Sequence, residues 1–477
     1  MSLTLSPGER LAVVGENGAG KSSLMNVLYG LYQPDVGQVR FGGETVRLSS
    51  PKDAVRRGIG MVHQHFALVP TLTVAENVML GHEPLRRGLL DARAAREEVV
   101  RAAKAAGFAL DPDATVGGLT VGSQQKVEIL KALARGAKTL ILDEPTAVLT
   151  PQEADELFAS ARALSEQGTS VVLISHKLAE VLAFATRIAV LRRGKLVRAD
   201  LEPAKTSPAE LAALMVGEGV ALDVPTGSGV AAGAKEVLRL ERLEAKGLAR
   251  VSLTVRAGEV VGIAGVDGNG QRELAEVLTG ARPWTAGTFT LLGQQRSALT
   301  PADCHALGIA HVPEDRLRDA VVKDLTVEEN VALGRHGAAP NARGPWVDVA
   351  GRHANAVTLM EASDVRPREP LLRLGELSGG NQQKLVVGRE LQGTPTLVVA
   401  VQPTRGLDLL AVAEVRRRLR QVADAGAGVL VVSLDLDEVR ALADTIVVLA
   451  HGRVTGTFAR GEADERELGR RMLAVSA

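Results

Sequence analysis

A glycine-rich loop that follows an apolar run is the feature that most constrains the fold of this chain. Residues 11–14 read LAVV and have strand character, and GENGAGKS follows from Gly15 to Ser22. This is the G-x-x-x-x-G-K-S pattern, and helix-like residues 23–29 come after it. Glycines let backbone NH groups turn toward an anion, and the positive end of the following helix adds to the attraction. The pattern predicts a strand, a phosphate-binding loop and a helix rather than a plain glycine turn.

This loop pattern also assigns roles to single residues. Lys21 is expected to reach the β- and γ-phosphates of a nucleotide, and the Ser22 hydroxyl is expected to hold Mg²⁺. The residues expected to line the nucleotide are Gly15, Glu16, Asn17, Gly18, Ala19, Gly20, Lys21, Ser22 and Ser23.

Composition and charge limit the classes of protein that fit the chain. At 477 residues, it is too long for one core, so we expect about two to four domains. Lysine plus arginine and aspartate plus glutamate number 56 each, so no overall field directs the chain to nucleic acid or an anionic membrane. The single cysteine, Cys304, excludes an internal disulfide framework, suits a reducing cytoplasm and is expected to be a small buried residue.

Membrane-spanning and secretory segments are not expected. The first ten residues lack the basic start and apolar core of a signal peptide. The apolar runs have strand length and stay far below the roughly eighteen residues that a spanning helix needs.

The chain repeats itself over a long period. SLTLSPGERLAVVG, which starts at Ser2, recurs as SLTVRAGEVVGIAG from Ser252, and LTVGSQQK at 119–126 recurs as LSGGNQQK at 377–384. A repeat of this length indicates two domains rather than a solenoid. The stretch 217–235 is rich in glycine and small residues, which is typical of a linker.

We therefore expect a first domain over residues 1–220, a linker over 221–235 and a second domain over 236–477. In the first copy, strand-like runs at 11–14, 139–142, 170–174 and 187–191 alternate with helical ones. This alternation predicts an α/β core with buried parallel strands.

Two further features concern the ends of this pattern. Residues 92–107 have apolar residues at helical spacing, which predicts a separate helical insert. The second copy has strand-like residues 237–243 ahead of Ser252, whereas the first copy begins at the matching point. We expect the natural chain to begin earlier than Met1.

Polar residues follow the predicted strands where a nucleotide would lie. TLILDEP at 139–145 ends in Asp143, placed to hold the Mg²⁺ shell, and Glu144, placed to orient or deprotonate the attacking water. His176 follows the next strand and is expected to contact the γ-phosphate, and Gln64 is expected to sense Mg²⁺ and water. Alone, each of these residues would more often be structural.

The stretch LSGGNQQK at 377–384 has a serine and two glycines ahead of a predicted helix. Such a helix start is suited to an anion, but it has no lysine that reaches a triphosphate. It is therefore better suited to closing over a nucleotide that is bound elsewhere.

These motifs together resemble the ATP-binding subunit of ABC transporters, nearly throughout the chain and twice. The resemblance implies an α/β fold of two tandem ABC-type P-loop NTPase domains. Each would have a RecA-like core, a helical subdomain and a partly antiparallel β subdomain. It also implies that two domains pair head to tail, with ATP between the phosphate loop of one domain and the signature motif of the other. The signature motif is LTVGSQQK at 119–126 in the first copy and LSGGNQQK at 377–384 in the second. An aromatic residue that usually stacks on adenine has no counterpart in residues 1–14.

The two copies differ at the positions that carry the chemistry. Matched to the first copy, the second has Gln271 for Lys21, Arg272 for Ser22, Val401 for Asp143, Gln402 for Glu144, Leu434 for His176 and Glu314 for Gln64. The reverse holds elsewhere, since the first copy has Val121 for Gly379 and Thr150 for Asp408.

Head-to-tail pairing would collect the intact parts in one site. The phosphate-loop residues, Gln64, Asp143, Glu144 and His176 would then face the second-copy residues Ser378, Gly379, Gly380 and Asp408. Independent loss would scatter the defects, so we expect one hydrolytic site and one that barely hydrolyses.

The resemblance is to ATPases of bacterial importers for simple sugars and nucleosides, and MVHQHFALVPTLTVAENV and IAHVPEDR resemble the nucleoside type. It implies ATP and Mg²⁺ as ligands, membrane permeases and an extracytoplasmic binding protein as partners, and a place at the cytoplasmic face of the plasma membrane. A groove near Gln64 and Glu314 would receive a permease helix. The alternatives are a simple-sugar importer ATPase, a soluble ABC protein acting on ribosomes, and a regulatory protein without turnover.

Overall fold

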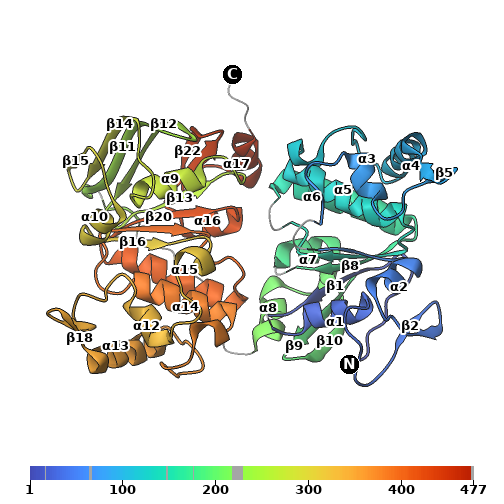
Figure 1. Cartoon of the computed structure of the whole chain (residues 1–477), viewed down its shortest axis with the longest axis horizontal. Coiled ribbons are helices and arrows are strands. Elements are labelled where there is room, and N and C mark those ends of the chain that lie inside the picture. The colour runs from blue at the N-terminus through green and yellow to red at the C-terminus, as the bar shows by residue number, and fades with distance from the viewer. Residues whose placement is uncertain are drawn as a thin grey trace. The chain divides into compact units, whose positions relative to one another are not determined.

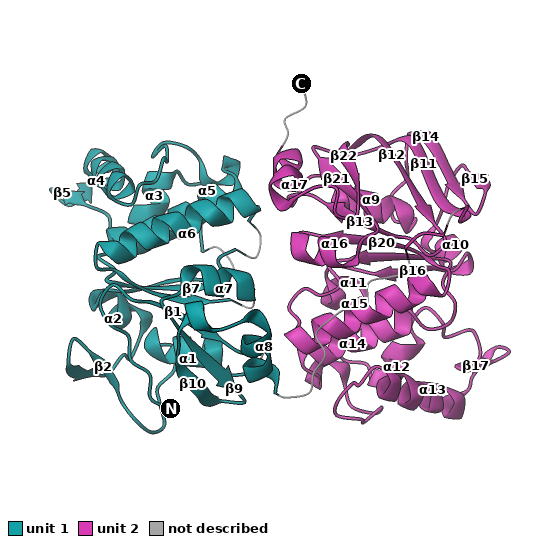
Figure 2. Cartoon of the chain, turned by 180° about the vertical axis from the view of Figure 1, so that it is seen from behind, with its two compact units in different colours: residues 1–220 teal, residues 221–477 magenta. Residues whose placement is uncertain are grey.

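The structure of the protein is a computed structural model that describes residues 1–16, 18–63, 67–146, 149–175, 177–217, 229–231 and 233–473. The chain forms two compact units, residues 1–220 and 221–477 (Figures 1 and 2). Most of the predicted linker lies outside the described residues.

The first unit is built on a sheet of mostly parallel strands. Its order is β10-β9-β1-β8-β7-β4, and only β10 runs antiparallel to its neighbour. The strand interiors are apolar and almost wholly buried because helices cover both faces of the sheet. The predicted parallel core is confirmed, with strands β1 (Arg10–Val14), β4 (Ile59–Val62), β7 (Thr139–Asp143), β8 (Ser170–Ile174), β9 (Arg187–Arg192) and β10 (Lys195–Leu201).

Helices of the first unit fall into two groups (Figure 1). Around the sheet lie α1 (Lys21–Leu28), α2 (Pro51–Arg56), α6 (Pro151–Glu166), α7 (Leu178–Phe184) and α8 (Pro208–Val216). The predicted insert is confirmed as α4 (Ala92–Ala105), which packs with α3 (Val74–Met79) and α5 (Val121–Ala134). Short elements complete the unit: β2 (Val39–Phe41), β3 (Glu44–Val46), β5 (Leu85–Arg86), β6 (Leu89–Leu90), η1 (Val116–Gly118) and η2 (Pro203–Lys205).

The second unit repeats this sheet in the same spatial order, β16-β19-β20-β13-β21-β22, again with the last strand antiparallel. The strands are β13 (Val260–Ala264), β16 (Ile309–Val312), β19 (Leu397–Val401), β20 (Gly428–Ser433), β21 (Thr445–Ala450) and β22 (Arg453–Ala459). The helices around the sheet are α9 (Gln271–Leu278), α10 (Pro301–Ala306), α11 (Arg316–Asp319), α15 (Leu409–Asp424), α16 (Leu436–Leu442) and α17 (Glu465–Met472). Its insert holds α12 (Val327–Ala332), β17 (Ala342–Arg343), β18 (Trp346–Val347), α13 (Val349–Ala362), η3 (Leu374–Glu376) and α14 (Gly379–Glu390).

An antiparallel sheet distinguishes the second unit from the first. Its strands are β11 (Glu236–Ala245), β12 (Leu248–Arg256), β14 (Ala286–Leu291) and β15 (Gln294–Arg296), so the predicted strand at 237–243 is confirmed. Pairing with β11 stabilises β12. Residues 2–5 match part of β12 but form no strand, because the described part of the first unit offers them no such neighbour. Leu3 and Leu5 still pack on the core.

Among the described residues, no helix combines the length and the apolar character that a bilayer span requires. Cys304 is 3% exposed, which confirms the expected small buried residue, and burial raises the pKa of its thiol to about 11.

Candidate functional site

The glycine-rich loop of the first unit joins β1 to α1, as predicted. Gly20 precedes the helix with φ of 100°, a left-handed conformation that favours glycine. The Lys21 side chain is 7% exposed, and its Nζ donates to the carbonyl oxygens of Gly15 at 2.6 Å and Glu16 at 2.9 Å. The ammonium group therefore lies folded across the loop, where it can meet a phosphate.

The first turn of α1 is open to an anion. Ser22 and Ser23 are exposed, and no acidic residue lies in this turn to neutralise the positive helix end. Gly18 also has free space around its Cα. Asn17 lies outside the described residues, so its role stays a prediction.

Two acids lie where β7 ends, at the carboxyl edge of the sheet: Asp143 is the last residue of the strand, and Glu144 follows it. Burial and the neighbouring Glu144 raise the pKa of the Asp143 carboxyl, and the positive charge of Lys21 opposes this shift. Glu144 has φ of 48°, and its NH donates to the carbonyl oxygen of Ile174 at 2.8 Å. The structure thus gathers Lys21, Asp143 and Glu144 at one edge of the sheet, the usual ligand edge of parallel sheets.

His176 and Gln64 lie outside the described residues, so their catalytic roles also stay predictions. The strand before His176, β8, ends at Ile174, and the hydroxyl of the next residue, Ser175, accepts from the Lys177 NH at 3.1 Å. Glu180 anchors the same turn, because it accepts hydrogen bonds from Thr146 at 2.7 Å and Ser175 at 3.3 Å.

A cavity of about 210 Å³ has His63 and Ala67 in its lining. Helix α5 contacts Ala67: the Ala67 NH donates to Glu128 at 2.5 Å, and Lys131 Nζ donates to the Ala67 carbonyl at 2.9 Å. The cavity is lined by Tyr29, Met61, His63, Glu128, Lys131 and Arg135, among others. The expected permease groove near Gln64 stays a prediction.

The matching loop of the second unit keeps its shape without its lysine. Gly270 has φ of 101°, and Gln271 is 6% exposed, with Nε2 donating to the Val266 carbonyl at 2.9 Å. A neutral amide therefore lies where the first unit has an ammonium group. Arg272 points its charge to Glu276 of the same helix, with 2.9 Å between Nε and Oε1.

The end of β19 shows the same retention of shape. Gln402 has φ of 49°, and its NH donates to the Val432 carbonyl at 2.7 Å, as Glu144 does at the end of β7. Val401 is buried in place of Asp143. This strand end has lost both carboxylates while keeping the backbone that presents them.

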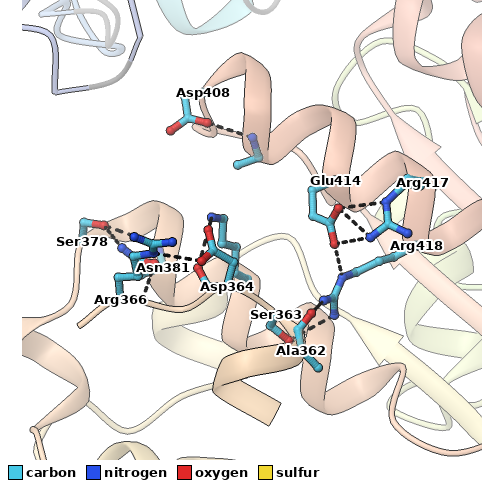
Figure 3. Close-up of polar contacts among 12 residues, drawn as sticks. Ala362, Ser363, Asp364, Arg366, Ser378, Asn381, Asp408, Glu414, Arg417 and Arg418 are labelled. Atoms are coloured by element: carbon cyan, nitrogen blue, oxygen red, sulfur yellow. Dashed lines mark hydrogen bonds and ion pairs between the residues drawn. The ribbon is translucent and has the colours of Figure 1, made fainter. Parts of the chain in front are cut away.

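Helix α14 begins with the signature motif of the second unit. The Ser378 hydroxyl caps the helix by accepting from the Asn381 NH at 3.4 Å and from its Nδ2 at 2.9 Å (Figure 3). Asn381 is held in turn by the Arg366 NH at 2.9 Å, and Arg366 pairs with Asp364. Gly380 has open space around its Cα, so the first turn of the helix remains accessible.

Asp408 lies at the start of α15 and caps it, because its Oδ1 accepts from the Ala411 NH at 2.8 Å (Figure 3). Thr150 caps α6 of the first unit in the same way, by accepting from the Glu153 NH at 3.3 Å. Both residues therefore have a structural role. At this position the two copies therefore share the helix cap and differ in charge, because Asp408 is an acid and Thr150 is neutral.

The described site residues belong to two groups, each in its own unit. Lys21, Asp143 and Glu144 meet in the first unit, and Ser378, Gly379, Gly380 and Asp408 lie at two helix starts of the second. Sequence reasoning missed Arg316, which contacts the signature helix of the second unit. The arginine in the PEDR stretch was the available signal.

Two α/β units, each with a glycine loop between a central strand and a helix, define the class of P-loop nucleotide-binding proteins. The family described as ABC transporter matches residues 1–147 and 248–405 of the chain. Among curated proteins, the guanosine import ATP-binding protein NupO of Bacillus subtilis is 44% identical over 475 residues, covering 98% of this chain and 92% of NupO. The chain belongs to the ABC transporter family, as an ATP-binding ATPase.

Further similarities fit this family. The nucleoside import ATP-binding protein NupA of Lactococcus lactis is 42% identical, covering 98% of this chain and 93% of NupA. The ribose import ATP-binding protein RbsA 2 of Streptomyces coelicolor is 41% identical, covering 97% of this chain and 88% of RbsA 2. An archaeal ribosome recycling factor, aABCE1, has a similar solved structure at a TM-score of 0.63 and 20% identity, covering 98% of this chain and 88% of that chain. At this identity the likeness concerns the fold alone.

Proposed function

We propose that this chain is the ATP-hydrolysing subunit of a bacterial importer for nucleosides. The similarity to NupO and NupA, over nearly the full length of all three chains, supports this cargo class. The permease helix would dock at the cavity that His63 and Ala67 help to line, and the chain would act as a peripheral subunit at the cytoplasmic face of the plasma membrane. An extracytoplasmic binding protein would deliver the cargo.

We further propose that hydrolysis takes place in one composite site. The supporting observation is where the functional residues lie. Lys21, Asp143 and Glu144 are all present in the first unit, and the accessible helix start at Ser378 is in the second. Head-to-tail pairing of the two domains, residues 1–220 and 236–477, would place these groups on one ATP. The second composite site would combine the Gln271 loop of the second unit with the Val121 helix of the first unit, and it would barely hydrolyse ATP.

The residues of this chain would divide the chemistry as follows. Lys21 and the NH groups of the loop bind the phosphates, and the positive end of α1 adds to their attraction. Glu144 orients and deprotonates the attacking water, and His176 contacts the γ-phosphate. The Ser378 hydroxyl and the NH groups of Gly379 and Gly380 cover the γ-phosphate from the other side, beside Asp408.

The donor set of the first unit fits Mg²⁺. Hydroxyl, carboxylate and amide oxygens are the ligands that this ion prefers, and they are offered by Ser22, Asp143 and Gln64. Burial and the neighbouring negative charge of Glu144 raise the pKa of the Asp143 carboxyl, and a bound cation would offset both effects. When bound, Mg²⁺ would neutralise charge on the β- and γ-phosphates.

A nucleoside uptake assay tests the proposal. A strain that lacks this protein should lose uptake of radiolabelled guanosine, and the wild-type gene should restore it, whereas Glu144→Gln should not. Undiminished guanosine uptake in the deletion strain, together with lost ribose uptake, would move the cargo to simple sugars.

Simple-sugar import is the second candidate because RbsA 2 is nearly as similar as the nucleoside proteins. Action on ribosomes has support from fold alone. Co-purification separates these classes: membrane permeases in the pull-down support an importer, and ribosomes contradict it. The complete phosphate loop of the first unit disfavours a regulatory protein without turnover.

A further inference from the structure

The connection between the sheet and the helical insert differs between the two units. In the second unit it runs over residues 313–326, between β16 and α12, and is three residues longer than residues 63–73 of the first. The longer connection contains the short helix α11, which begins at Arg316. The second unit therefore has a feature here that the described part of the first unit lacks.

Arg316 reaches the first turn of the signature helix. Its Nη2 lies 2.5 Å from the position that a Cβ atom would take at Gly379, and its Nε donates to Gln382 Oε1 at 3.4 Å. A Cβ atom at residue 379 would collide with the end of this flexible side chain and displace it. In the first copy the matching residues are Phe66 and Val121, so the arginine and the glycine are exchanged together.

Gln382 connects Arg316 to the turn that precedes the signature motif. The residue is 6% exposed, and its Nε2 donates to the carbonyl oxygens of Leu374 at 3.2 Å and Leu377 at 3.0 Å. Leu377 directly precedes Ser378, the capping residue. The guanidinium group therefore contacts the signature turn in two ways. It lies directly against Gly379, and it reaches the carbonyl groups of Leu374 and Leu377 through Gln382.

The positive charge of Arg316 lies close to the start of helix α14. The side chain is half-buried, and burial lowers the pKa of its guanidinium group, although Asp315 opposes this effect. No carboxylate among the described residues comes within ion-pair distance of it. A cation beside the positive end of α14 is electrostatically unfavourable.

A second contact ties the same connection to the strand end. Glu314 Oε1 and Arg405 Nη1 form an ion pair of 2.5 Å, and Arg405 belongs to the loop after β19. Residues 314–316 therefore link this loop to the signature helix. Glu314 is also the counterpart of Gln64, so the segment lies where a permease contact is expected.

We propose that Arg316 is a positioning residue that holds the signature turn of the second unit in the geometry needed to close over ATP. It acts through Gly379 and Gln382 and touches no reacting atom. This inference rests on the proposed composite site. It explains why the second signature keeps glycine at residue 379 and the first does not.

Three substitutions of Arg316 test the role in the full-length chain with its permease. Arg316→Ala and Arg316→Met should lower kcat for ATP about tenfold, on the scale of one charged hydrogen bond, with the Kd for ATP unchanged. Arg316→Lys should restore part of the rate because it keeps the charge. The matched control is Arg318→Ala on the same helix, since Arg318 is exposed and pairs only with Asp319 among the described residues.

A double-mutant cycle separates positioning from general destabilisation. Gly379→Ala should lower kcat in the wild-type background but add little in Arg316→Ala, because the collision is then gone. Equal rates for Arg316→Ala and Arg318→Ala, or additive effects in the cycle, would overturn the inference. Thermal unfolding of each variant shows that it is folded.

Different results would contradict the proposed composite site and the proposed role of Arg316. If Lys21→Ala abolishes turnover while all Arg316 variants match the wild type, only this inference falls. If Lys21→Ala retains turnover, the proposed composite site itself falls.

Discussion

The two units of this chain share a fold and differ in their chemistry. Both have the same six-stranded order, and both place a glycine with φ near 100° before the first helix. Glu144 and Gln402 adopt φ of 48° and 49° at matching strand ends. Such backbone strain is often attributed to catalysis. Here it persists where the carboxylate is gone, so the strand end itself imposes this conformation.

The two phosphate loops also share a structure and differ in charge. Lys21 and Gln271 both donate from their side chains to carbonyl oxygens of their own loop. The hydrogen bond stabilises the loop in either case, but only the ammonium group carries a charge for a phosphate. Shape and binding chemistry can therefore be separated at this position.

The largest expected difference between the units concerns the two strand ends. Glu144→Gln should leave ATP binding intact and lower turnover by on the order of a hundredfold or more, the scale of losing a general base. Gln402→Ala, its matched control, should stay within about twofold. Steady-state ATPase assays check both, and near-normal turnover of Glu144→Gln would remove this residue from the role.

The phosphate loops should differ next most strongly. Lys21→Gln copies the second unit into the first and should weaken ATP binding by about thirtyfold, because a charged hydrogen-bond donor is lost. Gln271→Ala should change it by less than about twofold. Equilibrium titration with a fluorescent ATP analogue measures both. A larger loss in Gln271→Ala would reverse our assignment of the two sites.

The helix caps allow a comparison at equal cost in stability. Ser378→Ala and Thr120→Ala each remove a capping hydroxyl and should each destabilise their helix by about 1 kcal/mol. Only Ser378→Ala should slow ATP turnover, by about tenfold. If both variants lose activity equally, the effect is one of stability, and the signature of the second unit has no special role.

The smallest expected effect comes from partial repair of the second unit. Gln402→Glu restores one carboxylate, but Val401 and Arg272 still replace the predicted metal ligands, and Gln271 still replaces the lysine. Turnover should change by less than about twofold. A doubling of ATPase activity would mean that the second site is closer to competence than the Gln271 loop indicates.

Much of the fold follows from sequence pattern. The runs at 139–142 and 170–174 are apolar throughout, so burial on both sheet faces was predictable, and the observed strands differ by at most one residue. Residues 2–5 have the same pattern as part of β12 and form no strand, because strand formation there depends on a pairing partner rather than on local preference.

The site was predictable where a motif has fixed spacing and not where contacts are long-range. The loop around Lys21 and the acids at 143 and 144 lie at positions that the motifs define. Arg316 meets Gly379 across 63 residues of sequence, and no local pattern encodes such a contact. Asp408 and Thr150 cap their helices in the same way, so the predicted functional difference between them concerns charge and stays a prediction.

An ATP-loaded structure of the Glu144→Gln chain tests the central claim most directly, because this variant should bind ATP without consuming it. The account predicts ATP phosphates beside Lys21 with the Ser378 helix start across them, in a single hydrolytic site. ATP beside Lys21 with the Ser378 helix remote from it, or hydrolysis products found only beside Gln271 in the wild-type chain, would contradict the account.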